Sequence, residues 1–159
     1  MKSRSTALFL LVAAALCGTL LMRAADSAAA PRVVKIRAGV ENAMKFDVTS
    51  ISAAPGESIK VVLTHAGTLP KNVMGHNWIL LTAGNDPVAF AAAAAPEAEN
   101  GYIPAKLKDK IVAFIPLLGP GESGDVTFLA PMEPGEYPFL CSFPGHCLVG
   151  MKGVLVVKK

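Results

Sequence analysis

The sequence has little excess charge of either sign. Lysine and arginine number 15 against 12 aspartates and glutamates, and from Ala30 onward 12 basic residues face 11 acidic ones. Nucleic-acid binding needs clustered basic charge, so this balance excludes a nucleic-acid footprint, and it provides no large steering field. No internal repeat divides the 159 residues, whose length suits one domain with a single sizeable core.

Cysteine and histidine are scarce as well. There are three cysteines, of which Cys17 falls in an apolar N-terminal run, and three histidines, His65, His76 and His146. The remaining pair, Cys141 and Cys147, would by itself be interpreted as one disulfide in an exported protein. An enzyme with two metal clusters needs several histidines for each cluster. Three histidines could supply one metal site at most, so the sequence excludes the multicopper enzymes.

The N-terminus has the pattern of an export leader. Lys2 and Arg4 precede an apolar run over 6–22, and small residues follow over 24–30. This pattern predicts a signal peptide with its junction over residues 1–30, a folded domain over 31–159 and a periplasmic location. The apolar run is at the lower limit of length for a spanning helix, so a retained anchor that holds the domain at the periplasmic face of the membrane is the alternative.

Short segments in which apolar and polar residues alternate, or in which β-branched residues are frequent, predict strands, and Pro-Gly and Gly-Pro turns separate them. The expected strands are 33–37, 44–51, 58–65, 76–82, 111–115, 126–129, 135–141 and 152–157. The only helix signal is the Ala-rich segment 89–98, inside a connection over 84–110 that we expect to lie over the strands. The fold class predicted is all-β, an antiparallel Greek-key β-sandwich with one Ala-rich helical insert.

Soft metal ligands gather in one short segment near the C-terminus. Cys141, His146 and Met151 offer a thiolate, an imidazole and a thioether, and His76 offers a second imidazole. Two histidines, one cysteine and a weak axial methionine are the ligands of blue-copper electron-transfer sites. Zinc also binds cysteine and histidine, but the methionine favours copper. The remaining alternative is a disulfide or free thiol with core histidines.

Two neighbours of these ligands have expected roles of their own. Asn77 directly follows His76 and is expected to hydrogen-bond across to the segment that carries the other ligands. Cys147 directly follows His146, and we interpret it as a bystander, with a bridge to Cys141 only in metal-free protein or a bridge to a second molecule as the alternatives.

Two motifs resemble those of the azurins. Residues 69–80, Leu-Pro-Lys-Asn-Val-Met-Gly-His-Asn-Trp-Ile-Leu, are similar to the first azurin copper motif, and 141–146 with Met-Lys-Gly at 151–153 are similar to the second. The resemblance implies a cupredoxin sandwich, one type 1 copper and periplasmic electron transfer between larger redox proteins. It also implies that the Gly75 carbonyl lies near the metal. The implied docking patch for redox partners comprises Met44, Leu69, Met74 and Gly145, with Leu148 as an addition.

The sequence departs from the azurin pattern at three points. Four residues separate His146 from Met151, a spacing that resembles plastocyanins and auracyanins instead. The cysteines of the azurin disulfide have no counterparts near Val33 or Ser58, and Cys147 is an unusual neighbour for a ligand. The resemblance also implies that His65 lies near the site without being a ligand, where packing alone is an equal alternative.

The leading function is therefore a small exported electron carrier with no enzymatic activity. A site saturated by two histidines, a cysteine and a methionine leaves no open position for a substrate, which catalytic metals require. The alternatives are a copper-binding or delivery protein that holds exchangeable Cu(I), and a metal-free structural domain. Membrane contact is expected only if the leader is retained as an anchor.

Overall fold

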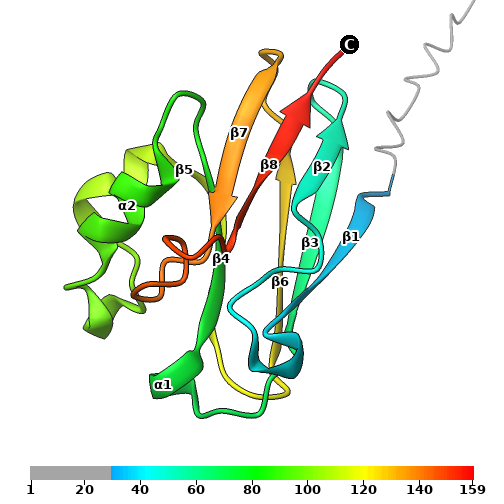
Figure 1. Cartoon of the computed structure of the whole chain (residues 1–159). Helices are drawn as coiled ribbons and strands as arrows, with labels where there is room; N and C mark the ends of the chain where they lie inside the picture. The colour runs from blue at the N-terminus through cyan, green and yellow to red at the C-terminus, as the bar shows by residue number, and fades with distance from the viewer. Residues whose placement is uncertain (1–29) are drawn as a thin grey trace, which may run out of the picture.

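The computed structural model describes residues 30–159, so the predicted signal peptide falls almost wholly outside the described residues. Two sheets pack face to face, with strand orders β1-β3-β6 and β2-β8-β7-β4-β5 (Figure 1). The strands are β1 (Arg32–Ala38), β2 (Ser50–Ala53), β3 (Ser58–His65), β4 (His76–Leu81), β5 (Ile111–Leu118), β6 (Ser123–Leu129), β7 (Gly135–Leu140) and β8 (Lys152–Val157). No helix within residues 30–159 is long and apolar enough to cross a membrane.

The predicted β-sandwich is confirmed, with one difference in strand direction. Strands β1 and β3 pair in parallel, as do β2 and β8, whereas the other pairs of neighbouring strands are antiparallel. The parallel β1–β3 pair arises because the chain leaves β1, crosses to the other sheet for β2 and then returns to the first sheet as β3. A sequence pattern does not reveal such a crossing between sheets.

The predicted strand over 44–51 is wrong in its first part. Only Ser50–Ala53 forms β2, and the preceding segment is a loop in which Phe46 makes one isolated bridge to Ala38. Residues 40–42 form the 3₁₀ helix η1, and Glu41 and Asn42 have left-handed backbone angles that no strand contains. This loop carries the chain across the end of the sandwich.

Strand β4 is buried along its whole length, which sets the position of the site. One face belongs to the inter-sheet core, where Trp78 and Leu80 pack with Phe139. The other face, with Ile79 and Leu81, is covered by the connection between β4 and β5. A strand covered on both faces is expected to be largely apolar, and β4 is apolar throughout after His76 and Asn77.

The helical insert is confirmed with shifted bounds. Helix α2 (Pro87–Ala94) is capped at its N-terminus by Asp86, whose side chain accepts a hydrogen bond from the Val88 N–H at 2.8 Å. It lies against the outer side of the five-stranded sheet (Figure 1), with Phe90 in the second apolar cluster. The 3₁₀ helices η2 (Ala98–Asn100) and η3 (Ala105–Lys110) complete the insert, and the short helix α1 (Lys71–Met74), which the sequence did not predict, precedes β4.

Candidate metal centre

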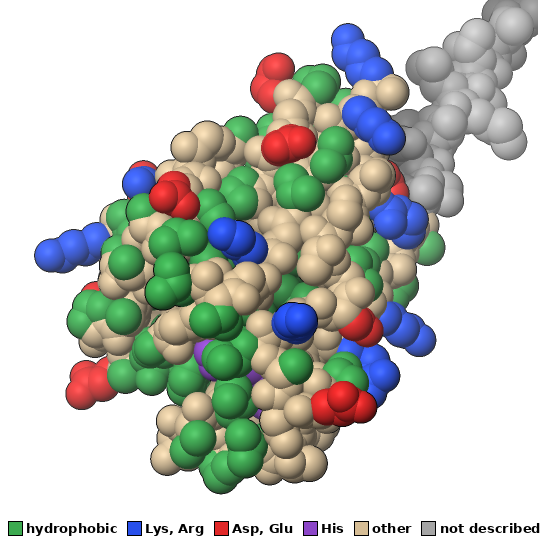
Figure 2. Space-filling view, viewed as in Figure 1, with side chains coloured by type: hydrophobic (Ala, Val, Ile, Leu, Met, Phe, Trp, Pro, Cys, Tyr) green, Lys and Arg blue, Asp and Glu red, His purple; other side chains and the backbone are tan. Residues whose placement is uncertain are grey.

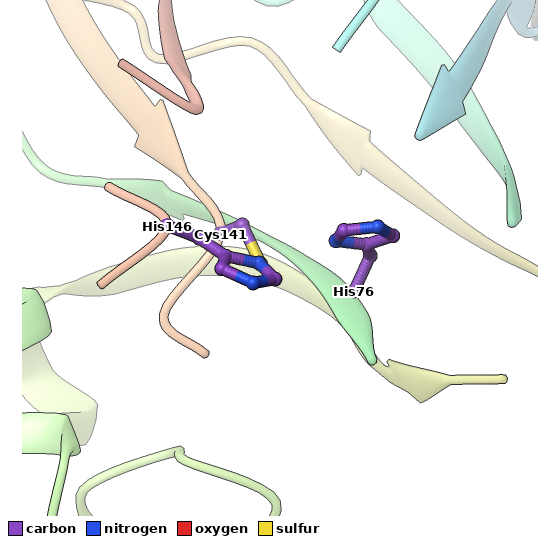
Figure 3. Close-up of side chains that lie close together, drawn as sticks. All are labelled: His76, Cys141 and His146. Carbon is purple, nitrogen blue, oxygen red and sulfur yellow. The ribbon is translucent and has the colours of Figure 1, made fainter. Parts of the chain in front are cut away.

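Three of the predicted ligands converge at one end of the sandwich. The ligand atoms of His76, Cys141 and His146 all lie within 4.8 Å of one another (Figure 3). His76 is the first residue of β4 and Cys141 directly follows β7, so both are held by hydrogen-bonded strand ends. The Cys141 Sγ and His146 Nδ1 are 3.5 Å apart. Two imidazoles and one sulfur at this spacing form a set of soft ligands for one metal ion.

The ligand loop, residues 141–151, is closed by its own backbone. The Met151 N–H donates to the His146 carbonyl at 2.9 Å, and the Cys141 N–H donates to the Met151 carbonyl at 3.1 Å. Gly145 and Gly150 supply positive φ angles of 84° and 106°, which few other residues adopt. The loop therefore brings Met151, which is fully buried, back beside Cys141. Coordination by Met151 and by the Gly75 carbonyl stays a prediction.

Burial keeps the metal-free site uncharged. Desolvation, followed by repulsion from His146 and His65, lowers the pKa of His76 to about 3, and desolvation followed by repulsion from His65 lowers the pKa of His146 to about 4. Desolvation raises the pKa of Cys141 to about 12, although backbone hydrogen bonds from Asn77 and Phe143 act in the opposite direction. A metal bound here would therefore be held by two neutral imidazoles, and its binding would release one proton, from the Cys141 thiol.

His76 is the clearest sign that the site is built for a metal. Both of its ring nitrogens are buried and lack hydrogen-bond partners among the described residues. A buried polar atom without a partner costs free energy, which a bound cation would recover. A Cβ on Gly39 would lie 2.5 Å from the His76 Nε2, so only glycine fits beside this ring. The donor set and the unpaired nitrogens together fit a copper ion.

Asn77 links the two ligand-bearing segments, as predicted. Its Oδ1 accepts from the Ser142 N–H at 2.8 Å, and its Nδ2 donates to the Ser142 Oγ at 2.8 Å and to the Gly101 carbonyl at 3.3 Å. The Ser142 hydroxyl in turn donates to the Tyr102 carbonyl at 2.6 Å. Sequence reasoning missed Ser142 and Tyr102, although the position of Ser142 next to Cys141 could have indicated the first of them.

His65 lies beside the three ligands but is not one of them. His65 is the last residue of β3, and its ring packs on the His76 ring with centroids 4.6 Å apart. The Gly67 N–H donates to its Nδ1 at 3.1 Å, and its Nε2 lies 2.9 Å from the Met74 carbonyl. With Nδ1 accepting, Nε2 carries the proton and donates to that carbonyl, so the ring makes two hydrogen bonds within the protein.

Cys147 is a free, buried thiol, and the disulfide reading is wrong for this structure because Cys141 is free as well. The two cysteines pack on different sides of the five-stranded sheet. Cys141 belongs to the core between the sheets, whereas Cys147 contacts the α2 side, where its Sγ donates to the Pro87 carbonyl at 3.4 Å. The thiol therefore ties the ligand loop to the insert.

The predicted docking residues are exposed to different degrees. Leu148 is 74% exposed, Met44 37% and Leu69 36%, Gly145 is exposed, and Met74 is half-buried. Val149 at 56% exposure extends the apolar surface on the ligand loop. In Figure 2 histidine atoms are visible between hydrophobic side chains on the viewed face. Apolar surface thus adjoins the buried ligands, while the docking role of these residues stays a prediction.

The pKa values of the two ligand histidines predict how acid affects the metal-free protein. Above about pH 6.5, the ordinary pKa of histidine, both rings are neutral in the folded and unfolded chain. As the pH falls from there to about 4, only the unfolded chain takes up these protons, so the free energy of unfolding falls. Urea unfolding with a chelator present, from pH 7.5 to 4.5, measures this slope. The His76→Gln variant should show a shallower slope, and an identical slope would contradict the assignment.

A β-sandwich that holds two imidazoles and a cysteine sulfur at one end defines a single-copper cupredoxin. The chain belongs to the copper binding proteins of the plastocyanin/azurin family, whose sequence profile matches residues 33–158. It is an electron-transfer protein that carries one type 1 copper.

Individual proteins support this assignment. The azurin of Pseudomonas fluorescens biotype A is 37% identical over 128 residues, which cover 78% of this chain and 98% of that protein. Auracyanin-B of Chloroflexus aurantiacus is 35% identical over 79% of this chain but 52% of its own length. A solved structure of auracyanin B superposes with a TM-score of 0.71, at 35% identity, over 82% of this chain and 91% of that one.

Proposed function

We propose that the chain is an exported, non-enzymatic electron shuttle that exchanges single electrons with larger redox proteins. One observation carries the proposal. The buried ligand atoms of His76, Cys141 and His146 lie within 4.8 Å of one another, and both nitrogens of His76 have no hydrogen-bond partner within residues 30–159. Met151 would add a weak thioether ligand, and the Gly75 carbonyl would be a further weak neighbour of the metal. Because the His76 Nε2 lies against Gly39, Nδ1 is the nitrogen left for the metal.

The residues around the site suit electron transfer because they resist movement. Copper bound here would supply a single-electron couple. His76 and Cys141 are fixed by strand ends, and Asn77 joins their segments through Ser142, so the ligand positions change little when the charge changes. A site whose geometry suits both Cu(I) and Cu(II) would need little reorganisation when an electron is transferred. The buried ligands also exclude water from the site.

Burial also favours an electron carrier over a copper-delivery protein. His76 and Cys141 have no exposed surface and His146 is 1% exposed, so an incoming chelator or partner ligand cannot reach the metal without opening the loop. An enzymatic role is disfavoured because all three histidines of the sequence are taken up in or beside this one site. Catalytic metals keep a position open for substrate.

An optical and EPR spectrum of the Cu(II)-loaded domain tests the proposed function. We expect an intense absorption at roughly 600 nm and narrow hyperfine splitting, the signature of a thiolate-bound type 1 copper. Reversible voltammetry together with slow copper release to a chelator would separate the electron carrier from a delivery protein. A pale, ordinary Cu(II) spectrum, or rapid release, would contradict the proposal.

We further propose that redox partners dock on the apolar surface of Met44, Leu69, Met74, Gly145 and Leu148. Leu148→Glu is expected to slow electron self-exchange several-fold, because it places a charge on a surface that must lose its water when two molecules make contact. The reduction potential should stay nearly unchanged. Leu129→Glu is the matched control, since Leu129 is 66% exposed but lies on β6 of the three-stranded sheet. Equal self-exchange rates in the two variants would contradict this docking face.

The predicted leader supports export to the periplasm. It falls outside residues 30–159 apart from Ala30, so the support comes from its sequence alone: basic residues, an apolar run and small residues in the order of a signal peptide. Retention as a membrane anchor is the competing outcome. The mass of the mature protein and its release from washed membranes distinguish the two.

A further inference from the structure

Three aromatic rings in contact connect the metal centre to the insert. The His146 ring packs on Phe143 with centroids 4.7 Å apart, and Phe143 meets Tyr102 edge-on with centroids 5.1 Å apart. His146 is 1% exposed and Phe143 8%, whereas Tyr102 is only partly buried. The ring series therefore runs from a buried ligand to the protein surface without a gap wider than ordinary ring contact.

Tyr102 is held in this position at a conformational cost. Its φ of 62° lies in the left-handed region, which costs a bulky residue roughly 1–3 kcal/mol. Two hydrogen bonds from buried side chains hold the turn against this cost, one from the Ser142 hydroxyl to the Tyr102 carbonyl and one from Asn77 to the Gly101 carbonyl. The same residues that position the ligand loop thus fix the outermost ring against Phe143.

The surface beside Tyr102 differs from the proposed docking surface. Tyr102 belongs to neither ligand-bearing segment, and the residues that precede it, Glu99 and Asn100, are exposed and polar. The docking surface is apolar and adjoins His146 through Gly145 and Leu148. A partner with a polar surface would have no favourable contact with the apolar face, but it could approach Tyr102.

We propose that Tyr102 is a second, lateral point of electron entry and exit, used by a one-electron redox protein that docks over the Gly101–Tyr102 turn. The electron passes between the metal centre and the partner by tunnelling through the contacting rings of His146, Phe143 and Tyr102. The centre loses one electron and the partner gains one, no ring is oxidised, and no proton moves. This inference rests on the proposed electron-shuttle function.

The test measures intramolecular electron transfer from a fixed position. A ruthenium polypyridyl label is attached to a histidine introduced by Glu99→His, which takes the label selectively because the three natural histidines are buried. Flash oxidation of the label to ruthenium(III) then draws one electron from the reduced protein. Tyr102→Asn removes the ring while keeping a residue that tolerates a positive φ, and Tyr102→Gly is a second ring-free variant if the first does not fold.

We expect the transfer rate to fall several-fold in the ring-free variant and to stay at the wild-type value in Tyr102→Phe, with the optical spectrum and reduction potential unchanged in both. With the label on Lys35→His, on the exposed face of β1, the ring-free variant should transfer at the wild-type rate. In the metal-free protein, NMR should show contacts between the ring protons of Tyr102 and Phe143.

An unchanged rate from the Glu99 position in the ring-free variant would overturn the proposal, as would missing ring contacts in the metal-free protein. An equal fall in the transfer rate with the label at position 35 would also overturn the proposal, because such a fall would show a general change in the metal centre. A loss in Tyr102→Phe as large as in Tyr102→Asn would overturn tunnelling through an unoxidised ring. Each of these failures leaves the blue spectrum intact, whereas failure of the proposed function removes that spectrum from the unmodified protein.

Discussion

Replacing Cys141 with alanine is expected to abolish the intense absorption at roughly 600 nm while leaving the fold intact, because the thiolate is the donor of the charge transfer to copper. The side chain is fully buried in the core between the sheets. Its loss removes one sulfur atom from a well-packed region, so the metal-free variant should lose about 1 kcal/mol of stability. The added stability that bound copper gives the folded state should disappear with the ligand.

Cys147→Ala is the matched control for this result. Both cysteines are buried and free, and only six positions separate them, but Cys147 contacts α2 through the Pro87 carbonyl. We expect Cys147→Ala to retain the blue absorption and to lose a comparable amount of metal-free stability. Absorption and circular dichroism of the copper-loaded variants separate the two roles. Loss of colour in both variants, or in neither, would contradict the assignment of the thiolate ligand.

Replacing Asn77 with alanine is expected to lower the free energy of unfolding of the metal-free protein by roughly 2–5 kcal/mol, because several buried hydrogen bonds are lost together. The Ser142 N–H, which now donates to the Asn77 Oδ1, would be buried without an acceptor. The two ligand-bearing segments would lose their direct side-chain link, so we also expect copper affinity to fall about 10–100-fold.

Asn85→Ala provides the control for the asparagine side chain itself. The Asn85 Nδ2 donates to the carbonyl and hydroxyl of Thr82 within one half-buried turn, away from the ligands. Its replacement should cost about 0.5–1.5 kcal/mol and leave copper affinity unchanged. Denaturant unfolding of the metal-free variants and competition with a chelator measure both quantities. Similar losses in the two variants would show that Asn77 has no special role.

The ligand residues could be predicted because their chemistry is local. Cys141, His146 and Met151 fall within one short segment, and Gly75-His76-Asn77 is a motif, so side-chain type and spacing were sufficient evidence. The structure brings three of the four predicted ligands together within 4.8 Å and buries Met151 beside Cys141. Strand β3 was predicted with its observed bounds because its residues are rich in β-branched types that favour strands. The structure adds that its inward residues alternate strictly with partly exposed ones.

The segments that were mispredicted are those where tertiary contacts override a local pattern. Residues 44–49 alternate like a strand, but they lie in a loop that crosses from one sheet to the other. The α1 helix is a single turn following Pro70, too short to leave a periodic signal. The parallel pairing of β1 with β3 depends on which sheet β2 joins, and no residue of β1 or β3 encodes that choice.

The amino-acid sequence by itself determined the chemistry of this protein, namely the kinds of ligand, the metal they suit and a sandwich of short strands. These properties depend on residue type and on spacing along one segment. The tertiary structure alone decided that Ser142 and Tyr102 join the ligand loop to the insert, that Cys147 faces α2, and that aromatic rings lead from His146 to the surface. The contacts of Ser142 with Tyr102 and of Cys147 with Pro87 join residues 40 and 60 positions apart, and packing between such distant segments leaves no trace in a local sequence pattern.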